Sequence, residues 1–415
     1  MQAVLLAAGK SSRFLPFNDS GHKVLVKIMG KTVIEHTLLS IKKTGIKEVI
    51  IIIGKDSNLA NVLGDGKTPG IKITYIVQPE PLGMGDGLLK AKDHLKSDFF
   101  LLNSYHAEFP EFKKMMEDKS NGNAVLLVKR DNCLERFGTL KTESDKVLDI
   151  IEKPQKGKEL SNLRVIGIYL LNKSFLKILE ETPLEHYHLE KALSRFAKTG
   201  KLKFVLTNKE TMSLKYSWDI LSFKNYLFKN MKKYISKKAK ISKDAQILGN
   251  VYIEEGVQIL EKACIKGPCY IGKNSYIGNS AILRQETCVE DNVVIGAFSE
   301  IKNSIVMHGS KIHSGFVGDS IIGEDCRIGA QFCTANKRID RGSVKTQIRD
   351  EKVDTGLKFL GAIVGNNVQI GIRSSTMPGI IIGSNTKIGP STTVLNNVSE
   401  NSKYYTKFQE VIEKK

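Results

Sequence analysis

The sequence predicts an α/β domain followed by a solenoid of short parallel strands. Its first half alternates apolar, strand-like runs with amphipathic helical runs, a pattern typical of a mostly parallel sheet covered by helices on both faces. Its second half places an apolar residue at every sixth position over a long stretch. A helix repeats about every 3.6 residues and a flat strand every two, so a six-residue period indicates coils stacked along an axis.

The first half predicts the elements of a single sheet. Two amphipathic runs predict helices over 32–45 and 85–96, and the first should end at Gly45, because glycine favours the conformation that closes a helix. A third run predicts a helix over about 219–238 that joins the two halves. Four apolar runs predict buried strands: AVLLAA (3–8), EVIIII (48–53), KITYIV (72–77) and DFFLLN (98–103).

The six-residue period begins at Ile241 and continues through eleven further apolar positions to Met307. The next position in this spacing is His313, which interrupts the apolar series. The period resumes at Val364 and continues to Val394. Between these two stretches, the charged segment 336–359 breaks the period, which predicts a surface loop ejected from the coils.

Composition narrows the function. No apolar run approaches the roughly 20 residues of a membrane span, and the N-terminus lacks a secretory pattern, so we expect a cytoplasmic protein without a membrane partner. Six cysteines form no CxxC pair, which argues against a disulfide framework or a zinc site. The net charge of +19 favours anionic partners. Because that charge is spread along the chain, we expect anionic substrates rather than nucleic acid.

The loop after the first strand, GKSSR (9–13), has the chemistry of an anion site. In parallel sheets ligands bind beyond the carboxyl ends of the strands, and backbone N–H groups there, with Lys10 and Arg13 nearby, suit a phosphate. The loop matches neither the phosphate loop of ATPases nor the dinucleotide fingerprint. Taken alone, it favours an anion site and a plain solvated loop about equally.

A wider stretch, LLAAGKSSRFLPF…HKVLVKIMGKTVIEHTL, resembles the signature of sugar-1-phosphate nucleotidylyltransferases. The likeness covers essentially the whole chain, because bifunctional members of this family also carry a left-handed parallel β-helix of hexapeptide repeats. It implies a Rossmann-like nucleotidyltransferase domain over 1–225, a linker helix over 226–239, a β-helix acyltransferase domain over 240–400 and a tail over 401–415. The implied reaction joins a sugar-1-phosphate to a nucleoside triphosphate, with N-acetylglucosamine-1-phosphate and UTP as the expected pair.

The resemblance also implies roles for residues of the first half. Arg13 and Lys23 would meet the triphosphate near the reacting centre, and Asp219 would bind Mg²⁺. The other implied contacts are to the nucleotide (Ala7, Ala8, Gly9, Lys10, Gln78 and Gly83) and to the sugar (Gly138, Glu152, Lys153 and Asn162).

One metal position departs from the family. Where relatives carry Gly-Asp, with the aspartate as the second Mg²⁺ ligand, this chain has Ser104 and Tyr105, followed by His106. Tyrosine is not a normal Mg²⁺ ligand, and imidazole suits softer ions. We therefore expect Mg²⁺, with Mn²⁺ as an alternative, on Asp219. His106 is either a second ligand, a donor to a phosphate or a structural residue, and Asp86 is a local substitute for the missing carboxylate.

Four segments of the second half, AILRQE, SEIKNS, SKIHSGFVGDS and TANKRID, resemble in this order the acetyltransferase site of the bifunctional members. By that likeness Arg284 and Lys302 hold the phosphate of an amino-sugar-1-phosphate. His313 would be the general base on the amine, since imidazole titrates near neutral pH. Asn336, with Lys345 from the ejected loop, would orient the substrates, and acetyl-CoA would be the co-substrate.

Two departures in this region keep alternatives open. Phe316 stands where relatives have tyrosine, and Gln331 stands where they have glycine. The leading hypothesis is a bifunctional enzyme that assembles as a homotrimer, with the acyl site at a subunit boundary. A second is a nucleotidylyltransferase of the glucose-1-phosphate or mannose-1-phosphate type, whose β-helix only forms trimers. A third is a weakly catalytic regulatory subunit that binds a nucleotide sugar, which the missing aspartate at Tyr105 favours.

Overall fold

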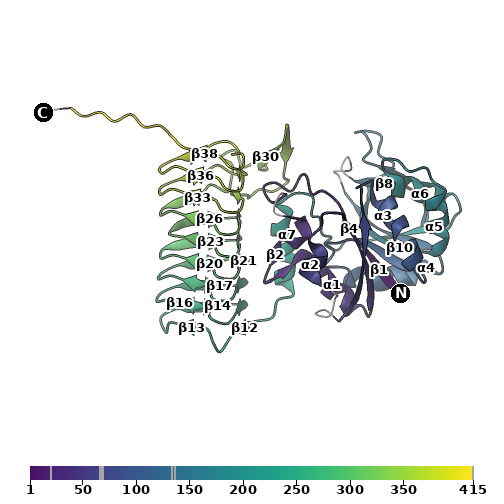
Figure 1. The fold of residues 1–415 in the computed structure, drawn as a ribbon, viewed down its shortest axis with the longest axis horizontal. Helices are drawn as coiled ribbons and strands as arrows, with labels where there is room; N and C mark the ends of the chain where they lie inside the picture. The colour runs from purple at the N-terminus through teal and green to yellow at the C-terminus, as the bar shows by residue number, and fades with distance from the viewer. Residues whose placement is uncertain (19–20, 65–69, 132–133, 135–136, 414–415) are drawn as a thin grey trace. The chain divides into compact units, whose positions relative to one another are not determined.

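A computed structural model describes residues 1–18, 21–64, 70–131, 134 and 137–413, so that Cys133 lies outside the described residues. By packing, the chain forms two compact units. The first consists of residues 1–10, 24–26 and 32–213, and the second of residues 11–23, 27–31 and 214–415. Each unit is described on its own (Figure 1). The expected domain boundaries at 225, 239 and 400 remain predictions.

A mixed sheet forms the centre of the first unit. The four strands expected from the sequence form its parallel half, in the order β5-β4-β1-β6. Beyond β6 the order continues β10-β7-β11-β9-β8, where β10 runs antiparallel to both neighbours. The strands are β1 (Gln2–Ala7), β4 (Glu48–Gly54), β5 (Lys72–Gln78), β6 (Phe99–Asn103), β7 (Ala124–Arg130), β8 (Gly138–Glu143), β9 (Lys146–Glu152), β10 (Leu163–Leu171) and β11 (Leu202–Leu206).

Helices pack on this sheet and bury its apolar side chains. The predicted first helix is confirmed: Thr32 and Glu35 form a capping box at its start, and Gly45 follows its end with a φ of 84°. The helix expected over 85–96 is shorter, because two glycines within it weaken the helix and a 3₁₀ turn follows it. The helices are α1 (Val33–Lys43), α2 (Leu59–Leu63), α3 (Met84–Lys90), α4 (Pro110–Ser120), α5 (Lys173–Glu180) and α6 (His188–Ala197), with 3₁₀ turns η1 (Lys23–Leu25) and η2 (Lys92–His94) and a small pair of strands, β2 (Lys27–Ile28) and β3 (Lys31–Thr32).

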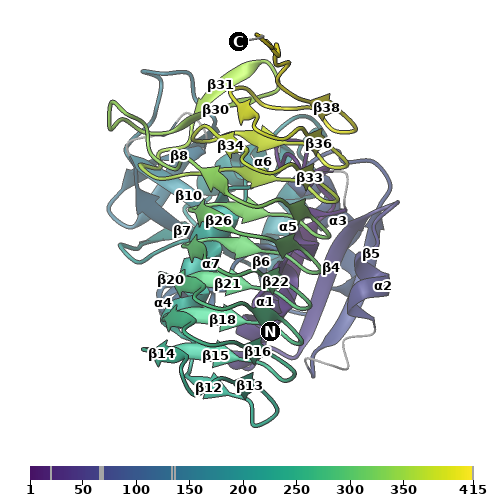
Figure 2. The ribbon, with the colours of Figure 1, turned by 90° about the vertical axis from the view of Figure 1, so that its left-hand side faces the viewer.

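The second unit is the predicted left-handed parallel β-helix, and the strands of each coil align with those of the next (Figure 2). Its first face contains β12 (Tyr234–Ile235), β15 (Val251–Ile253), β18 (Cys269–Ile271), β21 (Thr287–Val289), β24 (Ile305–Val306), β27 (Ile321–Ile322), β32 (Ile363–Val364) and β35 (Ile381–Ile382). Its second face contains β13 (Lys240–Ile241), β16 (Gln258–Ile259), β19 (Tyr276–Ile277), β22 (Val294–Ile295), β25 (Lys311–Ile312), β28 (Arg327–Ile328), β33 (Gln369–Ile370), β36 (Lys387–Ile388) and β38 (Lys403–Tyr404). Its third face contains β14 (Gln246–Leu248), β17 (Cys264–Lys266), β20 (Ile282–Arg284), β23 (Ser299–Lys302), β26 (Gly315–Gly318), β29 (Phe332–Thr334), β34 (Ser375–Thr376) and β37 (Thr393–Val394).

The coil shortens in the middle of the solenoid. Partner residues on the third face are 18 apart between β20 and β23 (282 and 300) but 16 apart between β23 and β26 (299 and 315). After the shortening Val306, and not Met307, joins the apolar core, and Ile312 takes the next interior position. His313, the next position in the six-residue spacing, is therefore not an interior position. It is exposed at the corner that follows β25.

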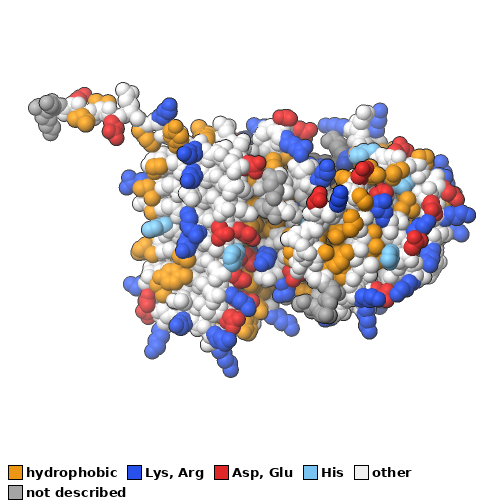
Figure 3. All heavy atoms as spheres, in the orientation of Figure 1, with side chains coloured by type: hydrophobic (Ala, Val, Ile, Leu, Met, Phe, Trp, Pro, Cys, Tyr) orange, Lys and Arg blue, Asp and Glu red, His pale blue; other side chains and the backbone are white. Residues whose placement is uncertain are grey.

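Two segments complete the second unit. The charged interruption leaves the coils, as predicted, and forms an antiparallel hairpin of β30 (Lys345–Ile348) and β31 (Glu351–Asp354). The predicted joining helix is shorter than expected, because α7 (Asp219–Lys229) ends before the first coil, whose strand β12 begins at Tyr234. Among the described residues, no helix is long and apolar enough to cross a membrane. Basic side chains are scattered over the face drawn in Figure 3, with acidic ones between them.

Candidate functional site

The phosphate-binding residues expected in the front half lie together in the second unit. Lys23 is half-buried, and its Nζ donates to the carbonyl oxygen of Leu214 at 2.7 Å. Burial lowers the pKa of Lys23 to about 8, an effect that the nearby Asp219 carboxylate opposes and Arg13 reinforces. These three charged groups thus form the cluster that the sequence predicted.

Asp219 and Arg13 are held in different ways. Asp219 begins α7, and its Oδ2 accepts the backbone N–H groups of Lys215 and Tyr216 at 2.6 and 2.9 Å. Arg13 is exposed, and its guanidinium carbon lies 6.0 Å from the centre of the Tyr216 ring, which stacks on Trp218. Since Arg13 is the exposed member of the cluster, it is the group best placed to meet an anion from solvent.

The other expected nucleotide contacts lie in the first unit. Ala7 ends β1, and Ala8, Gly9 and Lys10 follow it, with open space around Gly9.

Beside β5, the Gln78 amide is buried and donates to the Gly83 carbonyl at 3.0 Å and to Asp86 at 2.7 Å. Gln78 and Gly83 therefore come together as expected. Asp86 also lies 3.6 Å from Lys90, so its carboxylate is paired on both sides.

The expected sugar-binding residues gather around the β8–β9 pair. Gly138 faces Glu152 in the ladder, and a Cβ at Gly138 would come within 2.8 Å of the Glu152 carboxylate. Lys153 follows with a φ of 48°, and its Nζ lies 3.3 Å from the Tyr187 hydroxyl. Asn162 is exposed at the start of β10, where it accepts a hydrogen bond from Arg130.

Two residues that were not singled out from the sequence, Glu190 and Tyr169, lie near Glu152. Glu190, in the first turn of α6, is buried, and burial together with the Glu152 charge raises its pKa to about 7. Tyr169 on β10 is also buried, and Glu190 and Glu152 help to raise its pKa well above the usual value. No local motif marks either residue, because each is defined by neighbours from other elements.

His106 has a structural partner in the first unit. It is fully buried, and its Nδ1 lies 2.8 Å from Glu108, whose carboxylate also accepts the backbone N–H of Met212. Its Nε2 has no hydrogen-bond partner among the described residues. Within the described ranges, no three His, Cys, Asp or Glu side chains are grouped as a metal site. His106 as a metal ligand thus stays a prediction.

In the second unit, the two cations expected at the acyl site are direct neighbours. Arg284 ends β20 and Lys302 ends β23, and the two residues pair in the parallel ladder, so both side chains leave the same face of the sheet. Each is balanced by a carboxylate. Glu300 lies 2.6 Å from the Arg284 guanidinium, and Asp319 lies 3.0 Å from Lys302 Nζ.

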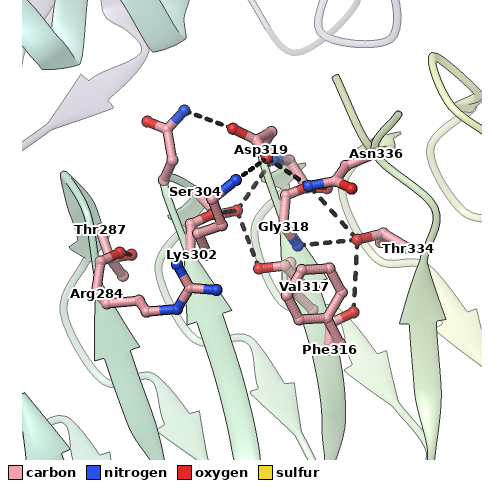
Figure 4. Close-up of polar contacts among 12 residues, drawn as sticks. Arg284, Thr287, Lys302, Ser304, Phe316, Val317, Gly318, Asp319, Thr334 and Asn336 are labelled. Carbon is pink, nitrogen blue, oxygen red and sulfur yellow. Dashed lines mark hydrogen bonds and ion pairs between the residues drawn. The ribbon is translucent and has the colours of Figure 1, made fainter. Parts of the chain in front are cut away.

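Asp319 is the centre of this arrangement (Figure 4). Its side chain is 3% exposed. Its Oδ2 accepts from Lys302 and, at 2.6 Å, from the Asn336 amide, while its Oδ1 accepts from Asn303 at 2.7 Å. Lys302 also lies over the ring of Phe359, 4.8 Å from its centre. The Asp of the VGDS segment was visible in the sequence, but only packing reveals that it joins Lys302 to Asn336.

His313 lies apart from this centre, because it precedes β26 whereas Asp319 follows that strand. His313 lines a groove of about 980 Å³ on the second face, beside Lys311 and Arg327. Gln331 has a φ of 61°, a backbone conformation in which glycine is favoured. Lys345 lies on the ejected hairpin, where it pairs with Asp354 in the ladder. Within the second unit, the structure therefore brings Arg284, Lys302 and Asn336 together, places His313 at the corner before β26 and leaves Lys345 on the hairpin.

Family models match both parts of the chain. The model described as nucleotidyl transferase matches residues 2–233. The model described as GMPPB C-terminal domain matches residues 265–371, and that of the bacterial transferase hexapeptide (six repeats) matches residues 361–396.

Similar proteins extend over the full length. The bifunctional protein GlmU of Methanococcus vannielii is 36% identical over 429 residues, which cover 100% of both chains. The bifunctional sugar-1-phosphate nucleotidylyltransferase/acetyltransferase of Sulfurisphaera tokodaii is 31% identical and covers 96% of this chain and 98% of its own. A structure from Bacillus anthracis, described as a glucose-1-phosphate thymidylyltransferase in complex with sucrose, matches with 21% identity and a TM-score of 0.51 over 57% of this chain and 98% of its own. At this identity the last likeness shows the fold alone.

Proposed function

Because the chain belongs to the family of bifunctional enzymes that join a sugar-1-phosphate nucleotidylyltransferase to a hexapeptide-repeat acetyltransferase, we propose that it makes UDP-N-acetylglucosamine in two steps. Glucosamine-1-phosphate is first acetylated by acetyl-CoA, and the product then reacts with UTP to release pyrophosphate. The observation that carries this proposal is the pairing of Arg284 and Lys302 on adjacent strands, with Asn336 joined to Lys302 through Asp319. A paired set of cations suits a phosphate bound to a small sugar.

In the acetyl transfer, Arg284 and Lys302 hold the sugar phosphate. His313 accepts the proton of the amine as the nitrogen attacks the thioester carbon, and the C–S bond then breaks to release the CoA thiol. An exposed histidine beside a groove with cationic walls suits this role, since the phosphates of acetyl-CoA need positive charge. We propose that a second copy of the chain covers this groove in a homotrimer.

In the nucleotidyl transfer, a sugar-phosphate oxygen attacks the α-phosphorus of UTP while the bond to pyrophosphate breaks. This chemistry needs alignment and positive charge more than covalent help. Arg13 and Lys23 supply that charge, and Gln78 and Gly83 read the base. Glu152 and its neighbours contact the sugar. We expect both steps in the cytoplasm.

A divalent metal fits this site through Asp219. One Asp219 oxygen is already engaged by two backbone N–H groups, and no three-residue cluster of metal-ligating side chains occurs in the part of the chain that is described. A single carboxylate suits Mg²⁺ that arrives on the triphosphate, because Mg²⁺ keeps several oxygen ligands that are not protein groups. When bound, the ion would neutralise charge on the phosphates.

Substrate assays test the proposal. The purified protein is given acetyl-CoA with a panel of amino-sugar phosphates, and separately each triphosphate with a panel of sugar phosphates. Release of CoA thiol with glucosamine-1-phosphate and of pyrophosphate with UTP and N-acetylglucosamine-1-phosphate is expected. Binding of a nucleotide sugar without pyrophosphate release from any triphosphate would instead support a regulatory subunit.

The residue at position 105 gives a sharper test of the metal. Tyr105→Asp restores a carboxylate at the end of β6 and should lower the Mg²⁺ concentration that gives half-maximal nucleotidyl transfer. Tyr105→Asn, which has similar size to the aspartate but no charge, is the matched control. An equal Mg²⁺ requirement in wild type and both variants would remove position 105 from metal binding.

A further inference from the structure

Lys224 is a fully buried lysine on α7. Most of the residues around it on the helix, including Phe223 and Tyr226, are apolar or aromatic and buried. A buried ammonium or amine needs partners, because an unpaired polar group in the interior is costly. Its Nζ donates to the Asn303 Oδ1 at 2.8 Å and to the carbonyl oxygen of Glu286. Lys224 thus contacts the two turns that follow β20 and β23. These strands end at Arg284 and Lys302, the two proposed phosphate-binding residues.

The Asn303 side chain extends this contact by one step. Its Oδ1 accepts from Lys224, and its Nδ2 donates to Asp319 Oδ1 at 2.7 Å. Because Lys224 donates to the amide oxygen, the amide nitrogen of Asn303 is the end that faces Asp319. If Lys224 could not donate, the amide would be free to turn its oxygen toward the Asp319 carboxylate, where the two acceptors would repel each other.

Asp319 in turn contacts the residues of the acetyl-transfer site. With Oδ1 held by Asn303, its Oδ2 is directed at Lys302 and Asn336. Figure 4 shows Lys302 and Asn336 directed at the Asp319 carboxylate. The result is an unbroken set of hydrogen bonds from Lys224 on α7 to the two side chains that act on the amino sugar.

We propose that Lys224 and Asp319 are positioning residues for acetyl transfer, acting through Asn303 to hold Lys302 and Asn336 in place. The proposal rests on the acetyltransferase activity proposed above and adds two residues for which no role was expected from the sequence. Neither residue need touch the substrate. They act by fixing the positions of the Lys302 ammonium and the Asn336 amide before the sugar phosphate binds.

The first test removes the donor. In Lys224→Met the buried volume is kept and the hydrogen bonds are lost. We expect the KM for glucosamine-1-phosphate to rise about tenfold, the order of one charge-assisted hydrogen bond, while the KM for acetyl-CoA stays unchanged. Lys229→Met, at the exposed end of the same helix, is the matched control and should match wild type. A merely structural Lys224 would lower the melting temperature and the active fraction but leave both KM values unchanged.

A double-mutant cycle tests the route. Asp319→Asn alone should raise the same KM, and adding Lys224→Met to it should change acetyl transfer no further, because the path is already broken. Additive effects of the two substitutions would overturn the proposed route. Nucleotidyl transfer, measured on the same samples, should remain within about threefold of wild type and reports that each variant is folded.

Asn303→Asp decides the matter if Lys224→Met does not fold. Asn303 has a φ of 44°, a conformation that aspartate also tolerates, and the new carboxylate can still accept from Lys224. It cannot donate to Asp319, so acetyl transfer should fall with a higher KM for glucosamine-1-phosphate. Wild-type kinetics in this variant would refute the positioning role. Absence of acetyl transfer in the wild-type protein would instead overturn the proposed function itself.

Discussion

Glu190 offers a test of the first unit that needs no substrate. Its carboxyl is 8% exposed, and burial, with the charge of Glu152, raises its pKa from 4.5 to about 7. Between these values the unfolded chain loses its proton while the folded protein keeps it, so folding becomes less favourable as the pH rises from about 4.5 to 7. At about 1.36 kcal/mol per pKa unit, this penalty approaches about 3 kcal/mol above pH 7.

Glu190→Gln removes the titration and keeps the size of the side chain. Relative to wild type, the variant should gain about 3 kcal/mol between pH 4.5 and pH 8, a relative rise in melting temperature of about 6 to 10 °C. Thermal unfolding followed by circular dichroism at both pH values measures it, with the exposed Glu181→Gln as the control. If the difference between variant and wild type is the same at both pH values, Glu190 is ionised in the folded protein and the argument fails.

Three further substitutions test other parts of the molecule. Arg13→Ala should weaken the use of UTP by about ten- to a hundredfold, the loss of one charge-assisted contact, and leave acetyl transfer intact; equal loss of both activities would indicate misfolding. His313→Ala should lower the kcat of acetyl transfer by about 10²- to 10⁴-fold without affecting pyrophosphate release, and a smaller loss would exclude it as the general base. Glu290→Ala removes the buried carboxylate that accepts the backbone N–H groups of residues 29 and 30 at 2.5 and 2.9 Å, and should cost about 2 to 4 kcal/mol of stability. Urea unfolding measures this loss, and an unchanged midpoint would contradict these two contacts.

Local sequence patterns were sufficient to predict much of the fold. The β-helix could be predicted because each coil repeats a short sequence whose aliphatic residue faces the interior, so that neighbours along the chain carry the information. The capping box at Thr32 and the glycine after α1 are equally local. The parallel half of the sheet followed from alternating strands and helices, but the antiparallel placement of β10 between β6 and β7 did not, since sheet order depends on pairing across long separations.

The candidate sites divide in the same way. The family resemblance implied Arg13, Lys23 and Asp219, which the structure groups, and Arg284 and Lys302, which the structure pairs on adjacent strands. The shortened coil was missed, because the first loss is of one residue before β24 and an apolar residue, Met307, still stands at the sixth position.

Tertiary structure alone decided the roles of the carboxylates. Asp319 lies between Lys302 and Asn336, and Glu190 lies beside Glu152, only because separate coils or elements meet there. A carboxylate's charge state and partners depend on burial and on neighbours distant in the chain, and neither is written in the residues beside it. The sequence by itself therefore determined the two architectures and the residue types of their sites, whereas three-dimensional packing determined which charges are paired, which are buried and which remain exposed to meet a ligand.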